Sequence, residues 1–194
     1  MIGNNPADKL LVDRVLRGDT RAFGIIINNT EALVAQIVFK FIPVAEDRKD
    51  LVQDVYLKVF HSLPGFKFKS KLSTWIAQIT YNACLSWVEK KKLVLTGNLH
   101  IEDDDPESGE TMAFISDSEY RLSQKELSGI LQKEIEQLPP TYQTLVILFH
   151  QESMSYDELA QITGLPEGTV KSSLYRARKM LKENLLLKYQ KEAL

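Results

Sequence analysis

The chain has 194 residues, of which 44% are hydrophobic and 26% are charged. This composition suffices for one large or two small globular domains and excludes a disordered or fibrous protein. The formal net charge of −2 excludes no class of partner, because charge is segregated along the chain. The single cysteine, Cys84, rules out an intrachain disulfide and predicts a cytoplasmic protein, and its apolar-periodic surroundings predict a small buried residue.

The first residues, MIGNNPADKLL, lack a basic segment followed by an apolar run, so we expect no signal peptide. No window approaches about 20 consecutive apolar residues, the length that spans a bilayer. We therefore expect no membrane insertion.

Apolar residues in the first half recur at helical spacing. A helix is expected after Asp8, a candidate N-cap, and should end at Gly18. Two further helical stretches follow, and an i, i+4 stripe over residues 51–63 predicts the next helix. A long helix is then expected from Trp75 to about Lys91.

Residues 102–119 contain eight acidic residues and no lysine or arginine, with few large apolar side chains. Such a segment cannot bury enough surface to offset the entropy of ordering it. We therefore predict an all-α protein of two small helical domains, residues 1–94 and 119–194, joined by a flexible acidic linker, residues 95–118.

The C-terminal domain carries the pattern of a helix-turn-helix. Ser155 and Glu158 form an S-x-x-E capping box at the start of a short helix. Gly164 suits a sharp turn, and Pro166 suits the opening of the next helix. That second helix should bury one apolar face, formed by Val170, Leu174, Ala177 and Leu181.

Basic residues gather in two places. From residue 166 to residue 192 there are seven basic and three acidic residues, a net charge of +4. From residue 67 to residue 92 there are six lysines and one glutamate, a net charge of +5, and aromatic rings interleave with the first lysines. Lysines that follow phosphates and rings that stack on bases are what nucleic-acid binding requires, although a solvated charged face is the alternative in each case.

Four motifs, in order, resemble the sigma-70 family of RNA polymerase sigma factors, of the short extracytoplasmic-function (ECF) type. GTVKSSLYRAR at 168–178 is similar to the GTVKSRLxRAR signature of the second DNA-binding domain, and LPPTY at 138–142 resembles the entry to that domain. DLVQDVYLKVF at 50–60 and WIAQITYN at 75–82 are similar to helices of the first domain. The resemblance covers nearly the whole chain apart from the linker.

The resemblance implies a sigma factor that directs core RNA polymerase to specific promoters, with no chemistry, cofactor or metal of its own. Its implied partners are the β′ clamp helices and the β flap of the polymerase, and promoter DNA; an anti-sigma factor is a further candidate that no motif demonstrates. The residues implied for docking on the clamp are Asp50, Gln53 and Asp54. Those for the −10 element are Phe66, Lys67, Phe68, Lys69, Lys71, Trp75 and Asn82. Those for the −35 element are Lys171, Ser172, Tyr175 and Arg176, and Lys179 continues the same basic stripe.

The chain departs from the family pattern in two segments. Ser173 stands where the family usually has an arginine that contacts phosphate or packs locally. Trp87 and Glu89 are unexpected on a face that should meet duplex DNA. For Trp75, a core position and a DNA contact are equally compatible with the sequence.

A stand-alone helix-turn-helix regulator is the main alternative function, and a helical adaptor that binds only protein is another. An enzyme is disfavoured because the three histidines are scattered and no phosphate-binding or catalytic motif is present. The acidic cluster at 102–105 lacks the spacing of a calcium loop. We also expect that the linker lets the two domains of the isolated chain pack together and hide their DNA-binding faces.

Overall fold

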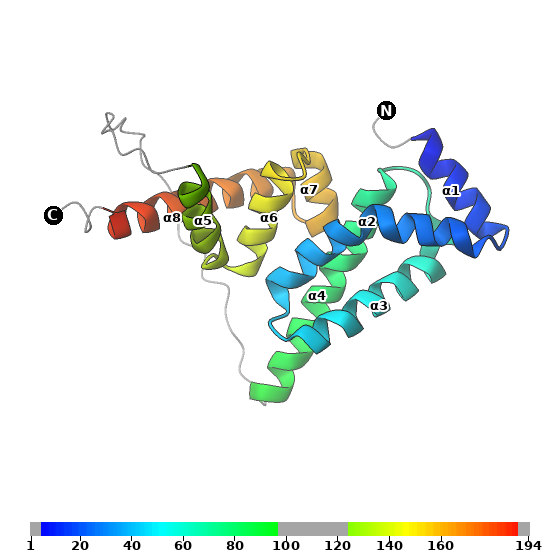
Figure 1. The fold of residues 1–194 in the computed structure, drawn as a ribbon, viewed down its shortest axis with the longest axis horizontal. Coiled ribbons are helices and arrows are strands. Elements are labelled where there is room, and N and C mark those ends of the chain that lie inside the picture. Colours follow the sequence, from blue (N-terminus) through cyan, green and yellow to red (C-terminus); the bar gives the residue numbers. More distant parts are fainter. Residues whose placement is uncertain (1–4, 97–123, 190–194) are drawn as a thin grey trace.

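A computed structural model describes residues 5–96 and 124–189 of the chain (Figure 1). Eight α-helices and one 3-10 turn make up these residues, and no strand occurs in either range. The predicted all-α fold is therefore confirmed. In chain order the elements are α1 (Pro6–Leu16), α2 (Thr20–Phe41), α3 (Ala45–Ser62), η1 (Leu63–Gly65), α4 (Leu72–Thr96), α5 (Gln124–Glu136), α6 (Pro140–His150), α7 (Tyr156–Thr163) and α8 (Glu167–Tyr189).

The first helix is capped by Asn5, whose side chain accepts a hydrogen bond from the backbone of Ala7. The predicted cap, Asp8, is wrong: it lies in the first turn, and its carboxylate instead accepts from the backbone N–H of Leu72 at 3.4 Å. Pro6 explains the shift, because proline favours the first helical position and so sets the start of α1 earlier. Gly18, at φ +92°, provides the left-handed turn that follows the helix.

The second helix is the central helix of the first region. Its buried residues pack against α1, α3, α4 and α6, and the buried Thr30 hydroxyl bonds to that of Tyr56 on α3 at 3.1 Å. By length and hydropathy alone α2 could cross a membrane. Its inward stripe instead contributes eight buried residues to the core of this fold.

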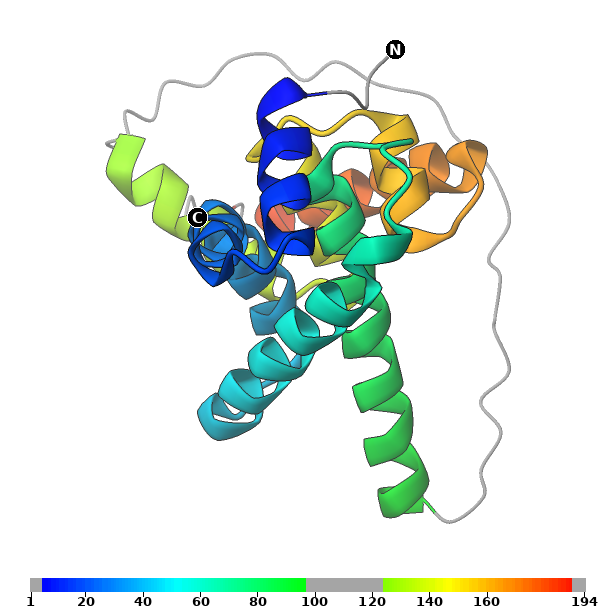
Figure 2. The ribbon, with the colours of Figure 1, turned by 90° about the vertical axis from the view of Figure 1, so that its right-hand side faces the viewer.

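The long helix α4 runs to Thr96, beyond the expected end near Lys91 and past the expected domain boundary at 94. In Figure 2 the end of α4 projects below the helices of the C-terminal region, while Lys91 still contacts Asp47 of α3. The remainder of the predicted linker and its acidic cluster lie outside the described residues.

The C-terminal region contains the predicted helix-turn-helix, formed by α7 and α8. The Ser155 hydroxyl accepts from the backbone N–H of Glu158 at 3.2 Å, and the Glu158 carboxylate accepts from that of Ser155 at 3.0 Å. Both halves of the predicted capping box are therefore present. Gly164 ends α7 in the left-handed conformation, at φ +72°.

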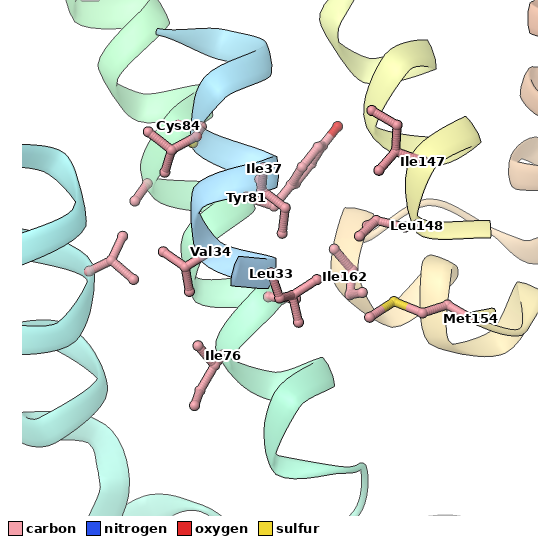
Figure 3. Close-up of a cluster of buried hydrophobic side chains, with 14 of the residues drawn as sticks. Leu33, Val34, Ile37, Ile76, Tyr81, Cys84, Ile147, Leu148, Met154 and Ile162 are labelled. Carbon is pink, nitrogen blue, oxygen red and sulfur yellow. The ribbon is translucent and has the colours of Figure 1, made fainter. Parts of the chain in front are cut away.

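The two helical regions pack directly on each other. Helix α4 lies against α7 and α2 lies against α6, so a single hydrophobic core runs through both regions. Figure 3 shows Leu33, Ile37 and Tyr81 pointing toward Ile147, Leu148 and Ile162. An apolar contact of this kind holds two regions in one orientation.

Candidate nucleic-acid and polymerase interfaces

The face of α8 predicted to read the −35 element is turned outward. Its inner stripe, Val170, Leu174, Ala177 and Leu181, is buried as predicted. Because the helical period places the other residues opposite this stripe, the side chains of Lys171, Ser172, Tyr175 and Lys179 are exposed, and Arg176 is half-buried. The face therefore presents ammonium, hydroxyl and phenol groups to solvent.

Ser173 belongs to the inner side of α8 rather than to this face, since it is 7% exposed. A long arginine at the same position would start from the core side of the helix. The burial of Ser173 agrees with the packing role, one of the two roles considered for the family's arginine.

An aromatic pair lies beside the basic face of α8. The rings of Phe149 and Tyr156 stack with centroids 5.0 Å apart. The Lys171 ammonium lies 5.2 Å from the Tyr156 ring centroid, and the Arg178 guanidinium lies 5.3 Å from that of Phe149. Lys171 also pairs with Glu167 at 2.6 Å, which raises the pKa of the lysine and keeps it charged.

The predicted −10 loop is built around three aromatic rings. Phe66 lies 4.7 Å from Phe68 and 4.9 Å from Trp75, measured between ring centroids. Phe68 has a positive φ of 54°, which is uncommon for a bulky residue and costs backbone strain. Phe66 is 8% exposed in the isolated chain and packs against both of these rings, so the expectation that it offers its ring to a base stays a prediction.

Trp75 is half-buried, so it serves the core and still keeps part of its ring accessible. Together with Phe66 it lines a cavity of about 420 Å³ whose rim carries Lys67 and Lys69. Gln161, from α7 of the other region, also lines this cavity. Asn82 lies exposed further along α4.

Lys71 is engaged by the second region. Its ammonium lies 2.9 Å from the carboxylate of Glu158 on α7. The same carboxylate oxygen accepts a hydrogen bond from the Thr74 hydroxyl at 3.3 Å. Sequence reasoning assigned Glu158 only its local capping role, and it missed Thr74 and Gln161, because no local pattern reports a contact between residues more than 80 positions apart.

The part of α4 that was expected to meet duplex DNA includes Lys91, which is paired within its own region. The Lys91 ammonium lies 4.4 Å from the Trp87 ring centroid and 3.4 Å from the Asp47 carboxylate of α3. The unexpected Trp87 therefore supports a neighbouring lysine.

The residues predicted to dock on the polymerase, Asp50, Gln53 and Asp54, are all exposed on α3. Beside them lies a groove of about 430 Å³ between α2 and α3, lined by Val38, Phe39, Val52 and Gln53 among others. The exposed Phe39 ring carries the Arg48 guanidinium 4.1 Å from its centroid. This surface combines carboxylates with an apolar groove, which suits a protein partner.

Cys84 is fully buried, as predicted, and its burial raises the pKa of the thiol to about 12. Within the described residues no three histidine, cysteine or acidic side chains gather into a group that could hold a metal ion. The acidic cluster at 102–105 lies outside those residues.

Comparison with known proteins matches both halves of the chain to one family. Residues 26–94 match the family model "Sigma-70 region 2", and residues 128–181 match "Sigma-70, region 4". The ECF RNA polymerase sigma-E factor of Escherichia coli K12 is 32% identical over 181 residues, which cover 90% of this chain and 92% of that protein.

Two solved structures have a similar fold. CnrH, in complex with the cytosolic domain of CnrY, has a TM-score of 0.61 at 21% identity and covers 92% of this chain and 97% of its own. The sigma factor RpoE of Bartonella quintana, in complex with the anti-sigma factor NepR, has a TM-score of 0.60 at 23% identity and covers 84% of this chain and 96% of its own.

These matches span both helical regions, so they do not favour the alternative of a stand-alone regulator. The chain belongs to the sigma-70 family, as an RNA polymerase sigma factor of the ECF type, and it acts with core RNA polymerase in initiating transcription at specific promoters.

Proposed function

We propose a division of labour between the two regions of this sigma factor. Residues 1–94 dock on the β′ clamp helices and capture the melted −10 strand. Residues 119–194 sit on the β flap and read the −35 element in the major groove. Residues 95–118 are the acidic tether between them.

The observation that carries this proposal is the two-sided character of α8. Its apolar stripe is fully engaged in the core, and the opposite face presents Lys171, Ser172, Tyr175 and Lys179 to solvent. A helix held in this way can enter a major groove, where lysine and arginine pair with guanine edges and serine with several bases.

For the −10 element, the support is the combination of Lys67 and Lys69 with the partly accessible Trp75 at one cavity. The lysines supply phosphate contacts, and the indole supplies an aromatic surface for a displaced base. Phe66 acts by supporting Phe68 and Trp75 from beneath.

Run-off transcription with bacterial core polymerase, with and without this protein, tests the proposal. Discrete start sites on fragmented genomic DNA should reveal two shared upstream elements. Lys67→Ala combined with Lys69→Ala should reduce open-complex formation without changing the −35 preference, whereas Lys58→Ala, an exposed lysine on α3, serves as the matched control. Equal effects of both variants would contradict the −10 assignment.

Docking on polymerase is tested separately by binding to core enzyme. Gln53→Ala with Asp54→Ala should weaken the complex, while Glu46→Ala, an exposed acid at the start of the same helix, should not.

Catalysis of RNA synthesis belongs to the polymerase, and we place the chain with that enzyme in the cytoplasm.

We further propose that an anti-sigma factor restrains this chain. Both similar structures are complexes: RpoE is bound to the anti-sigma factor NepR, and CnrH is bound to the cytosolic domain of CnrY. When this protein is affinity-purified from the source cell, the fraction that is not bound to polymerase should contain one such protein in an equimolar amount. Recovery of polymerase subunits alone would contradict this.

A further inference from the structure

Lys71 and Thr74 hold the Glu158 carboxylate as a binding site would hold an anion. The Glu158 carboxylate accepts from an ammonium and a hydroxyl at the start of α4. A DNA phosphate presents the same kind of acceptor oxygen to the same kinds of donor, and about half or more of protein–DNA hydrogen bonds join such pairs. We infer that, in the isolated chain, Glu158 occupies a DNA-phosphate site made by Lys71 and Thr74, and that Thr74 contacts the strand once α7 has moved away.

The anion is held firmly in place. Glu158 is 5% exposed, and its second oxygen accepts from both the backbone N–H and the hydroxyl of Ser155, each at 3.0 Å. Burial by itself would raise the pKa of Glu158, but the hydrogen bonds from Ser155 and Lys71 outweigh it and lower that pKa. The carboxylate is therefore charged at neutral pH and fixed on a short, capped helix.

The two donors, Lys71 and Thr74, lie on the surface proposed to bind the −10 element. Thr74 directly precedes Trp75, which lines the cavity that also carries Lys67 and Lys69, and Lys71 lies three residues before Thr74. Gln161, one turn along α7 from Glu158, lines that cavity as well. The same edge of α7 thus holds the anion site and one wall of the cavity.

The Thr74 hydroxyl is bonded differently from that of Thr80 on the same helix. The Thr80 hydroxyl bonds back to the Ile76 carbonyl at 2.8 Å, the usual arrangement for a buried helical threonine. The Thr74 hydroxyl reaches across to α7. Movement of α7 would free that hydroxyl to donate to another acceptor, such as a phosphate oxygen.

This inference rests on the proposed −10 role of the loop. It is tested first with the isolated full-length protein and a fluorescent single-stranded DNA of mixed sequence. Glu158→Gln preserves the capping geometry, since glutamine also serves in a capping box. It should tighten DNA binding about five- to tenfold, because an uncharged glutamine competes less well than the carboxylate with a DNA phosphate for Lys71 and Thr74.

Asp157→Asn is the matched control, because it removes the same charge from an exposed neighbour on α7 that bonds only within the helix, to Gln161. It should change the affinity less than twofold. Equal tightening by the two variants would show a general charge effect and overturn the inference.

The role of Thr74 is tested in the Glu158→Gln background. Thr74→Val should abolish most of the gain, whereas Thr74→Ser, which keeps the hydroxyl, and Thr80→Val, which removes the internally bonded one, should retain it. Circular dichroism confirms that each variant is folded. Full gain with Thr74→Val would overturn the inference.

Transcription by holoenzyme separates this inference from the function on which it rests. If Lys67→Ala with Lys69→Ala leaves promoter opening unchanged, the −10 assignment itself fails. If that pair impairs opening while Thr74→Val does not, the −10 assignment stands and the phosphate site at Thr74 is overturned. Impairment by both supports the inference.

Discussion

The start of α4 and the outward face of α8 are both basic, yet their surroundings differ. On α8 most of the residues proposed to read DNA face solvent, and Lys171 forms an ion pair with an exposed glutamate one turn away on the same helix. At the start of α4, Lys71 is paired with a buried carboxylate of the other region. A charge pattern therefore identifies residues that can bind phosphate, whereas the tertiary packing against them decides whether DNA can reach them.

The expectation that the packed domains hide their DNA-binding faces stays a prediction. The basic face of α8 is exposed, and so are Lys67 and Lys69 of the proposed −10 loop, although α7 engages Lys71. Helix α7 covers the start of α4, and the same helix carries α8 on its other side with its basic face outward. If the proposed assignments hold, the isolated chain presents the basic face of α8 without rearrangement, whereas Lys71 and Thr74 become free only when α7 moves.

The largest expected effect comes from detaching α8 from its core. Leu174 is 1% exposed, so Leu174→Ala should lower the free energy of unfolding by about 2–5 kcal/mol through lost burial and a residual cavity. Urea unfolding followed by circular dichroism measures it. Leu187→Ala on the same helix is the control, because Leu187 is 67% exposed and should change stability by less than about 0.5 kcal/mol. Similar losses in the two variants would mean that α8 is not anchored by this stripe.

Thiol labelling compares the buried and exposed surfaces directly. Because burial raises the pKa of Cys84 to about 12, the reactive thiolate is scarce at pH 8. Native Cys84 should react with a disulfide reagent at least about 100 times more slowly than a cysteine placed by Ser172→Cys in a Cys84→Ser background. Urea should abolish the difference. Rapid labelling of Cys84 in the folded chain would show that the core of α4 opens readily.

Loss of one outward lysine should have an intermediate effect. Lys171→Ala should lower transcription from a cognate promoter about tenfold, within the range of one specific base contact. The loss should disappear on a template whose −35 element is replaced. Lys182→Ala, further along α8 and also exposed, should cost less. A defect that persists on the replaced template would point to polymerase binding instead.

The smallest effect concerns acid stability. Burial opposes ionisation of Glu158, but hydrogen bonds from Ser155 and Lys71 lower its pKa overall. A carboxyl whose pKa is lower in the folded state stabilises the fold above its unfolded-state value, and this stability is lost as pH falls through the folded-state value. Below about pH 4.5, the usual glutamate value, wild type should lose stability more steeply than Glu158→Gln, and Asp157→Asn should follow wild type. Parallel curves for all three would contradict the contact with Lys71.

The features that the sequence predicted correctly are those set by near neighbours. The capping box of Ser155 and Glu158 joins residues three apart, and the turn at Gly164 needs only a residue tolerant of positive φ. The buried stripe of α8 follows from the helical period. The local errors were small: Asp8 in place of Asn5 as the first cap moved a helix start by three residues, and α4 ends at Thr96 rather than near Lys91.

The sequence by itself thus determined the helices, their caps, the helix-turn-helix and the two basic clusters, because each depends on residues within one or two turns of one another. Only the tertiary structure decided that Phe66 lies beneath its neighbours, that Ser173 faces inward, and that Lys71 meets Glu158. The physical reason is that these outcomes depend on how two separate apolar surfaces fit together, and contacts between α4 and α7 join residues more than 80 positions apart, beyond the reach of any local periodicity.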